Sequence, residues 1–140
     1  MTEIAGAGCE LCDAVDEASL WHDDFCRVVL VADADYPGFC RVVLNRHVRE
    51  MTDLEAGERE RLMRVVFATE AAVRRLMQPD KINLASLGNM VPHLHWHVIP
   101  RYADDRHFPN SVWGEPKRAG VARDVPREAI VTALRELLGK

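Results

Sequence analysis

His93-Leu94-His95-Trp96-His97-Val98-Ile99-Pro100-Arg101 has the most regular pattern of any segment in this chain. Its histidines alternate with apolar residues, which is the period of two that a β-strand gives its side chains. On a strand the three imidazoles share one face, roughly 6–7 Å from one to the next. Leu94, Trp96 and Val98 share the opposite face and can pack on a core. The stretch therefore predicts a half-buried strand that presents a row of imidazoles.

A row of three imidazoles suits two kinds of chemistry. Neutral imidazoles are metal ligands. Alternatively, the middle imidazole acts as a nucleophile, while its two neighbours bind or steer an anion. From the residues alone both interpretations stay open, beside the simpler one of a half-exposed strand that happens to carry histidines.

The segments before this stretch predict further strands. Apolar and β-branched runs favour strands over 26–32, 39–45 and 81–87, and a short strand or turn over 20–24. The turn residues of 33–38 join the first two runs as an antiparallel pair. If the short connection 88–92 is a hairpin, strand 81–87 lies antiparallel to the histidine strand.

Two helices are expected. Thr52-Asp53-Leu54-Glu55 has the form of a capping box, so a long helix is predicted to begin there and to run to about Met77. Its apolar stripe comprises Leu62, Val65, Val66, Thr69, Ala72, Val73 and Leu76. Asp124 is expected to cap a last helix that has Pro126 in its first turn and Gly139 at its end. Its apolar stripe comprises Ile130, Ala133, Leu134 and Leu137. This order of elements predicts an α+β fold, with helices packed on an antiparallel sheet.

Length and composition narrow the class of protein. At 140 residues the chain is expected to form a single domain, residues 1–140. Apolar residues make up 48% and charged residues 29%, as in soluble globular proteins. No stretch has the apolar length of a membrane span, and residues 1–6 lack the basic start and apolar core of a signal peptide, so the cytoplasm is the expected location. The net charge of −4 argues against a general nucleic-acid-binding surface.

The four cysteines fall into two kinds. Cys26 and Cys40 lie in apolar runs and are expected to be small core residues. Cys9 and Cys12 form a C-x-x-C pair, which taken alone is a redox dithiol, half of a zinc site or a coincidence. A tetrahedral zinc site needs two more ligands.

The histidine stretch, with its apolar pair and Pro100-Arg101, resembles the motif of the histidine triad (HIT) family of nucleotide hydrolases and transferases. The resemblance extends from about Cys9 to Trp113 and is strongest around the triad. It implies an antiparallel sheet with a long helix between its second and third main strands, and a homodimer. It also implies that His95 attacks the α-phosphate of a nucleotide, with a purine expected, and that His97 contacts the phosphate oxygens. The attacking nitrogen must be unprotonated, so the other ring nitrogen of His95 should donate to a backbone carbonyl.

The resemblance assigns further positions. Asn83 and Asn89 match amides that contact phosphate, and Asp33 matches an acid that grips the ribose hydroxyls. Met90 departs from the pattern, because it replaces a serine or threonine that helps to protonate or orient the leaving group. Cys9, Cys12, His47 and His93 match, in order, the ligands of a structural zinc that many bacterial members carry. With four protein ligands such a site is closed and structural.

These inferences lead to one main hypothesis and two alternatives. The main hypothesis is a nucleotide phosphoanhydride or phosphoramidate hydrolase that forms a covalent nucleotidyl-His95 intermediate. Its candidate substrates are dinucleoside polyphosphates and conjugates of nucleoside monophosphates. The alternatives are a nucleotide-binding regulator with little turnover, and a metal-dependent hydrolase in which the triad histidines hold the metal.

Overall fold

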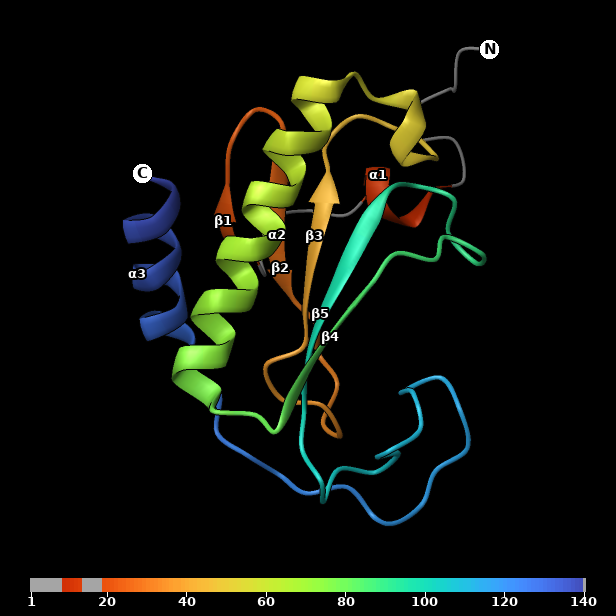
Figure 1. Cartoon of the computed structure of the whole chain (residues 1–140), viewed down its shortest axis with the longest axis vertical. Coiled ribbons are helices and arrows are strands. Elements are labelled where there is room, and N and C mark those ends of the chain that lie inside the picture. The colour runs from red at the N-terminus through yellow and green to blue at the C-terminus, as the bar shows by residue number, and fades with distance from the viewer. Residues whose placement is uncertain (1–8, 14–18, 140) are drawn as a thin grey trace.

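The computed structural model describes residues 9–13 and 19–139 of the chain. The segment 1–6, which lacks the features of a signal peptide, lies outside the described residues. The described part is centred on a five-stranded antiparallel sheet with the strand order β1-β2-β3-β5-β4 (Figure 1). The strands are β1 (Ser19–His22), β2 (Cys26–Leu30), β3 (Cys40–Leu44), β4 (Lys81–Ala85) and β5 (His95–Arg101). The predicted strands and the α+β class are confirmed, although each strand is shorter than its apolar run.

The histidine strand lies inside the sheet, between β3 and β4. His97 is paired with Arg41 on one side and with Ala85 on the other, and His95 is paired with Val43. Both neighbours run antiparallel to β5, as predicted for strand 81–87. A strand with a partner on each side has its backbone fixed by two ladders, so the imidazoles stand on a rigid support.

Two helices cover one face of the sheet (Figure 1). Helix α2 (Ala56–Met77) buries Leu62, Val65, Val66, Thr69, Ala72 and Val73, and α3 (Arg127–Leu138) packs beside it. The residues beneath them include Val28, Val42, Leu44 and Val98 of the sheet, and Leu94 just before β5. Leu94, Trp96 and Val98 thus face the core, as the period of two predicted. His95 and His97 are left for the opposite face of the sheet, whereas His93 lies before the start of β5, outside the predicted strand row.

The long helix begins later than the sequence predicted. Met51–Asp53 form a short 3-10 helix (η2), and α2 begins only at Ala56, with Glu55 as its N-cap. The backbone N–H of Glu55 donates to Glu58 Oε1 at 3.0 Å, so the capping pair lies three residues after the expected one. The cause is Leu54, whose extended backbone places its side chain in the core and interrupts the helix.

The last helix also differs at its start. Pro126 is the N-cap of α3, so Asp124 does not cap the helix and Pro126 lies before the first turn. Leu137 is 52% exposed, whereas Leu138 packs against the core. The buried row therefore follows the four-residue spacing from Ile130 through Leu134 to Leu138. The helix ends at Gly139, as predicted, with a φ of 89°.

A four-residue helix, α1 (Glu10–Asp13), contributes to a second, smaller core. Cys9 and Leu11 pack with Val43 of β3. Arg27 of β2 donates to the Leu11 carbonyl oxygen at 2.6 Å. These contacts fix α1 to the sheet. No described helix has both the length and the apolar content that a membrane span requires.

Candidate active site

The nucleophile candidate, His95, is the first residue of β5 and directly follows the connection from β4. His95 is buried, and its Nδ1 donates to the backbone carbonyl of His93 at 2.6 Å. A carbonyl oxygen only accepts, so Nδ1 carries the proton and Nε2 keeps its lone pair. The expected hydrogen bond is therefore present. The centroids of the His95 and His97 rings lie 4.9 Å apart, closer than the strand rise predicts, and the ring planes are inclined by 83°.

A cavity of about 500 Å³ opens at the two imidazoles. Its walls include His95, His97, Arg41, Asn89, Met90 and Trp113. A second cavity of about 430 Å³ also reaches His95 and contains Ser86 and Thr52. Volumes of this size are typical of sites for small-molecule ligands.

Burial and charge keep both imidazoles neutral. Burial lowers the pKa of His97 to about 4, and the neighbouring His95 and Arg41 add to the effect. Burial also lowers the pKa of His95; the hydrogen bond to His93 opposes this shift, and Arg41 reinforces it. A neutral imidazole is the form required of a nucleophile, and it can still donate one hydrogen bond to phosphate.

The first triad histidine belongs to a different cluster. One ligand atom each from Cys9, Cys12, His47 and His93 lie within 4.8 Å of one another. His93 Nδ1 is 3.3 Å from Cys9 Sγ, 3.2 Å from Cys12 Sγ and 3.2 Å from His47 Nδ1. Neighbouring ligand atoms of a tetrahedral zinc are separated by roughly 3.3–3.8 Å, given the usual bond lengths.

The protonation of His93 fits this cluster. Its Nε2 donates to the Leu44 carbonyl oxygen at 2.6 Å, which leaves Nδ1 unprotonated and directed at the two sulfur atoms. A hydrogen bond from the other ring nitrogen to a carbonyl is the usual way in which a metal-binding histidine is oriented. The four residues therefore have a geometry that can bind a metal ion.

A loop after β5 brings an aromatic side chain to the cavity. The Trp113 ring lies 4.9 Å from the His97 ring, centroid to centroid, and the residue is 51% exposed. Trp113 therefore forms part of the rim on the His97 side of the cavity.

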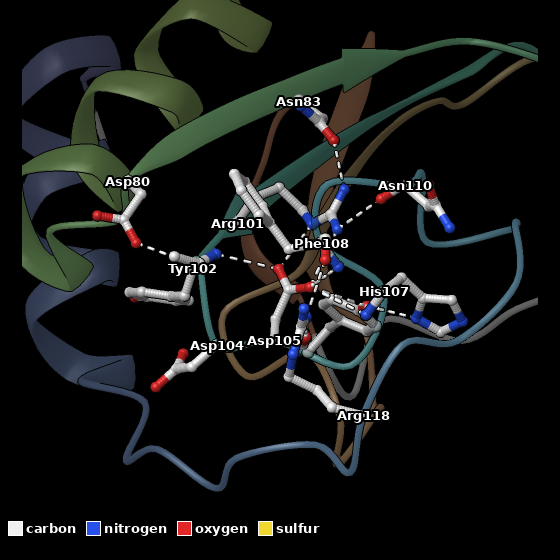
Figure 2. A network of polar contacts seen from close by, with 12 residues as sticks. Asp80, Asn83, Arg101, Tyr102, Asp104, Asp105, His107, Phe108, Asn110 and Arg118 are labelled. Carbon is white, nitrogen blue, oxygen red and sulfur yellow. Dashed lines mark hydrogen bonds and ion pairs between the residues drawn. The ribbon is translucent and has the colours of Figure 1, made fainter.

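A buried ion pair holds the start of this loop (Figure 2). Arg101, at the end of β5, donates through Nε to Asp105 Oδ2 at 2.8 Å and through Nη2 to Asp105 Oδ1 at 3.0 Å. Asp105 also accepts from the backbone N–H groups of Tyr102, His107 and Phe108. Arg101 donates in addition to the Asn110 carbonyl oxygen at 2.7 Å. The loop that carries Trp113 is thus anchored to the histidine strand itself.

A family model described as the HIT domain matches residues 14–104, which is well over half of the chain. The chain belongs to the HIT family. Solved structures agree: a histidine triad protein from Bradyrhizobium japonicum is 30% identical, with a TM-score of 0.70 over 86% of this chain and 89% of that one. Another, from Marinobacter aquaeolei VT8, is 34% identical, with a TM-score of 0.66 over 86% and 87% of the two chains.

A curated relative of the HIT chain carries a more specific name. The AP-4-A phosphorylase of Mycobacterium tuberculosis H37Rv is 29% identical over 97 residues, or 65% of this chain. The chain spans about half the length of that relative, 50% of which is covered.

The HIT structure brings some of the sequence-predicted residues together and separates others. Asn89 lies on the wall of the cavity with His95 and His97. The Asn83 side-chain oxygen instead accepts from Arg101 Nη1 at 2.9 Å, in the network of Figure 2. Asp33 lies in a turn, where its side chain accepts from the backbone N–H of Asp35 at 3.0 Å and borders a separate cavity of about 550 Å³.

Sequence reasoning missed Arg41 as a member of the HIT site. Arg41 is the cross-strand partner of His97 and lies on the wall of the same cavity. A signal was present, because an arginine between Cys40 and Val42 interrupts an otherwise apolar strand. A charged residue in such a run is expected to face away from the core.

Proposed function

We propose that this protein is a nucleotide phosphoanhydride or phosphoramidate hydrolase that acts through a covalent nucleotidyl-His95 intermediate. The observation that carries the proposal is the hydrogen bond from His95 Nδ1 to the His93 carbonyl, beside a cavity of about 500 Å³. It leaves the Nε2 lone pair available at a site large enough for a nucleotide phosphate. The name of the AP-4-A phosphorylase relative supports a nucleoside polyphosphate as substrate.

The proposed reaction has two displacements. His95 Nε2 attacks the α-phosphorus, an N–P bond forms, and the bond to the leaving oxygen or nitrogen breaks, with its electron pair departing on the leaving group. A nitrogen leaving group takes a proton from solvent as it departs. Water then attacks the same phosphorus, the N–P electron pair returns to Nε2, and the proton of the water passes to solvent. A covalent intermediate divides one difficult step into two easier ones.

The other site residues take supporting roles in this proposal. His97 donates a hydrogen bond to oxygens of the attacked phosphate, and Asn89 reaches the same phosphate from the cavity wall. Asn83 and Asp33, which are not among the residues that line this cavity, remain predicted contacts to phosphate and ribose. A homodimer remains a prediction from the family resemblance.

We further propose that the Cys9, Cys12, His47 and His93 cluster holds a structural zinc. Two thiolates and two imidazoles are a common ligand set for this ion, and four protein ligands leave no open position for an activated water. Bound zinc would supply a cross-link between α1 and the sheet. The alternative in which the triad binds a catalytic metal receives no support from the geometry, because His93 faces the cysteines while His95 and His97 face the cavity.

The decisive experiment combines His95→Ala with a search for the intermediate. A nucleotide labelled at the α-phosphorus should give a burst of labelled protein with the parent chain and none with the variant. Turnover should fall by several orders of magnitude, about the loss seen when a covalent nucleophile is removed, while nucleotide binding and the circular dichroism spectrum are retained. His22→Ala is the matched control, because His22 is exposed on β1.

Two outcomes would contradict the proposal. His95→Ala activity within about tenfold of the parent would defeat the covalent mechanism. Binding without a burst in the parent protein would favour the nucleotide-binding regulator.

A further inference from the structure

The cavity at His95 holds a cation that the rest of the site does not pair. Arg41 lies across from His97, on the face of β3 turned away from the helices. Glu10 is a carboxylate on the same wall, but its side chain is exposed, and the described residues give it no ion pair with Arg41. Arg41 is the one arginine or lysine among the described residues that line this cavity.

Hydrogen bonding at Arg41 is also incomplete. Its Nε is buried and has no partner within the described part of the chain, and the same holds for Nδ1 of His97. A buried polar atom without a partner costs free energy, and the cost is greater when the group is charged. Because Nε is also closed to solvent, a ligand would meet Arg41 through its terminal nitrogens, and a ligand rich in acceptor oxygens there would offset part of this cost.

We propose that Arg41 binds the leaving phosphate, so that the site favours nucleoside polyphosphates over phosphoramidates, an inference that rests on the function proposed above. His97 adjoins His95 on β5 and serves the attacked phosphate. Arg41 lies one strand away, across from His97, where it reaches the next phosphate of the chain. A guanidinium matches two phosphate oxygens at once.

The nature of Met90 supports the same choice of leaving group. Met90 is 93% exposed at the rim of the cavity, and its thioether sulfur carries no proton. An amine must be protonated to leave, whereas a phosphate, with a second pKa of about 6, departs as an anion. As the bridging P–O bond breaks, its electron pair stays on the bridging oxygen of the leaving phosphate. Arg41 stabilises that growing negative charge.

The test compares two substrates and three variants. Diadenosine tetraphosphate has an anionic leaving group, and adenosine phosphoramidate has a neutral one. Arg41→Gln should lower kcat/KM for the tetraphosphate by about 100-fold and for the phosphoramidate by less than about threefold. Arg41→Lys should give a kcat/KM for the tetraphosphate between those of the parent and Arg41→Gln. The lysine keeps the positive charge but cannot donate to two phosphate oxygens in the planar, forked geometry of a guanidinium. Arg46→Gln is the matched control, since Arg46 pairs with Glu58 at the surface, and it should change neither rate.

Two further measurements separate binding from folding. Calorimetry with inorganic tripolyphosphate should show binding to the parent that is at least about tenfold weaker in Arg41→Gln. Arg41→Met should unfold at a temperature no lower than the parent, because it removes a half-buried cation whose Nε has no hydrogen-bond partner among the described residues; a structural arginine would give the opposite result.

Two outcomes of the kinetic test would overturn the assignment of Arg41 to the leaving phosphate. Equal losses for the two substrates would place Arg41 at the attacked phosphate, and unchanged rates would remove it from the site. Either result, obtained while the parent still forms the labelled His95 intermediate, leaves the proposed function intact. If the parent forms no intermediate and turns over neither substrate, the proposed function fails, and the role of Arg41 fails with it.

Discussion

Burial and neighbouring positive charge both lower the pKa of the His97 imidazole. Burial is the larger, and the nearby His95 and Arg41 add to it, so the pKa of His97 falls to about 4. At neutral pH the ring is therefore uncharged and can donate one hydrogen bond. The positive charge that a phosphate requires must then come from another group, and Arg41 is on the same cavity wall.

The lowered pKa of His97 can be measured directly. An NMR titration of the folded protein should place the midpoint of His97 near pH 4, so the ring stays neutral until the pH falls through that value. The groups that face it in the described part of the chain include His95, Arg41 and the rings of Phe39 and Trp113. His97→Ala identifies the resonance. A midpoint at the ordinary histidine value, about 6.5, would contradict the buried position of the ring.

Asp105→Asn should lower the free energy of unfolding by about 3–5 kcal/mol at neutral pH, because Arg101 then stays buried without its counter-charge. Burial disfavours the ionised form of Asp105, but Arg101 and the N–H groups of Tyr102 and Phe108 outweigh it and lower the pKa to about 2. An unfolded aspartate titrates at about 3.9, so this carboxylate stabilises the fold above that pH by about 2.5 kcal/mol. That contribution is lost as the pH falls from about 4 to 2.

Urea unfolding of the parent and the variant across this pH range measures the effect. The difference in stability should be constant near neutral pH and should shrink in acid. Asp104→Asn is the control, because Asp104 is exposed and pairs with Arg123 at the surface, where an ion pair contributes about 0–1 kcal/mol. A stability difference that does not depend on pH would show that the Asp105 charge is not what stabilises the loop.

The residues of the candidate site were predictable to different degrees. Cys9, Cys12, His47 and His93 could be grouped because their order in the chain matches the zinc ligands implied by the family resemblance, and the structure does bring them together. Arg41 could not be grouped in this way, because its relation to His97 depends on the register between β3 and β5. Register is set by the whole sheet, and the sequence pattern of a single strand does not contain it.

At the level of elements, the loop that follows β5 connects a buried ion pair that stabilises the fold to the cavity at His95 and His97. The Arg101–Asp105 pair fixes the start of the loop, and Trp113 lies further along it, against His97. Val112 packs beside Tyr36, Phe39 and Ile99, which gives the loop a second anchor next to the tryptophan.

Trp113→Ala should therefore lower kcat/KM more than it lowers the stability of the fold. Loss of the ring contact with His97 is expected to lower kcat/KM by about 3- to 10-fold, the usual contribution of an aromatic pair. The unfolding temperature should change little, because the side chain is half exposed. Trp113→Phe keeps an aromatic edge and should retain most of the activity. Full activity in the alanine variant would mean that the ring only borders the cavity.

The elements themselves were predicted better than their ends. Periodicity placed the buried stripe of α2, because a helix that covers a sheet must repeat its apolar residues every turn. The start of α2 was wrong by several residues, since Thr52-Asp53-Leu54-Glu55 and Glu55–Glu58 both have the spacing of a capping pair. The choice between them was made by the burial of Leu54, which is a tertiary contact.

For the molecule as a whole, the metal cluster is expected to control the order of α1. This helix has four residues and rests on the sheet through a small core of Cys9, Leu11 and Val43. Chelation of the proposed zinc should increase amide exchange in 9–13 and lower the unfolding temperature, because the binding free energy of a structural metal is part of the folding free energy. Since Leu11 and Glu10 border the cavity, substrate binding should weaken as well.

Metal analysis and hydrogen exchange test this expectation together. Cys12→Ser should bind less zinc and reproduce the effect of the chelator, and added zinc should restore the parent after chelation. Turnover by the chelated protein should decline gradually with the loss of order, because the proposed chemistry belongs to His95. A well-folded preparation with intact thiols and no bound metal would reject the structural zinc.

His93 contributes three separate contacts from a single residue. Its Nδ1 faces the cysteines, its Nε2 donates to Leu44, and its backbone carbonyl accepts from His95. The ring therefore fixes the orientation of the peptide group that sets the tautomer of the nucleophile. Anyone who transplants this catalytic strand onto another scaffold, or evolves it toward new substrates in the laboratory, must move the cysteine pair and the histidine strand as one inseparable module.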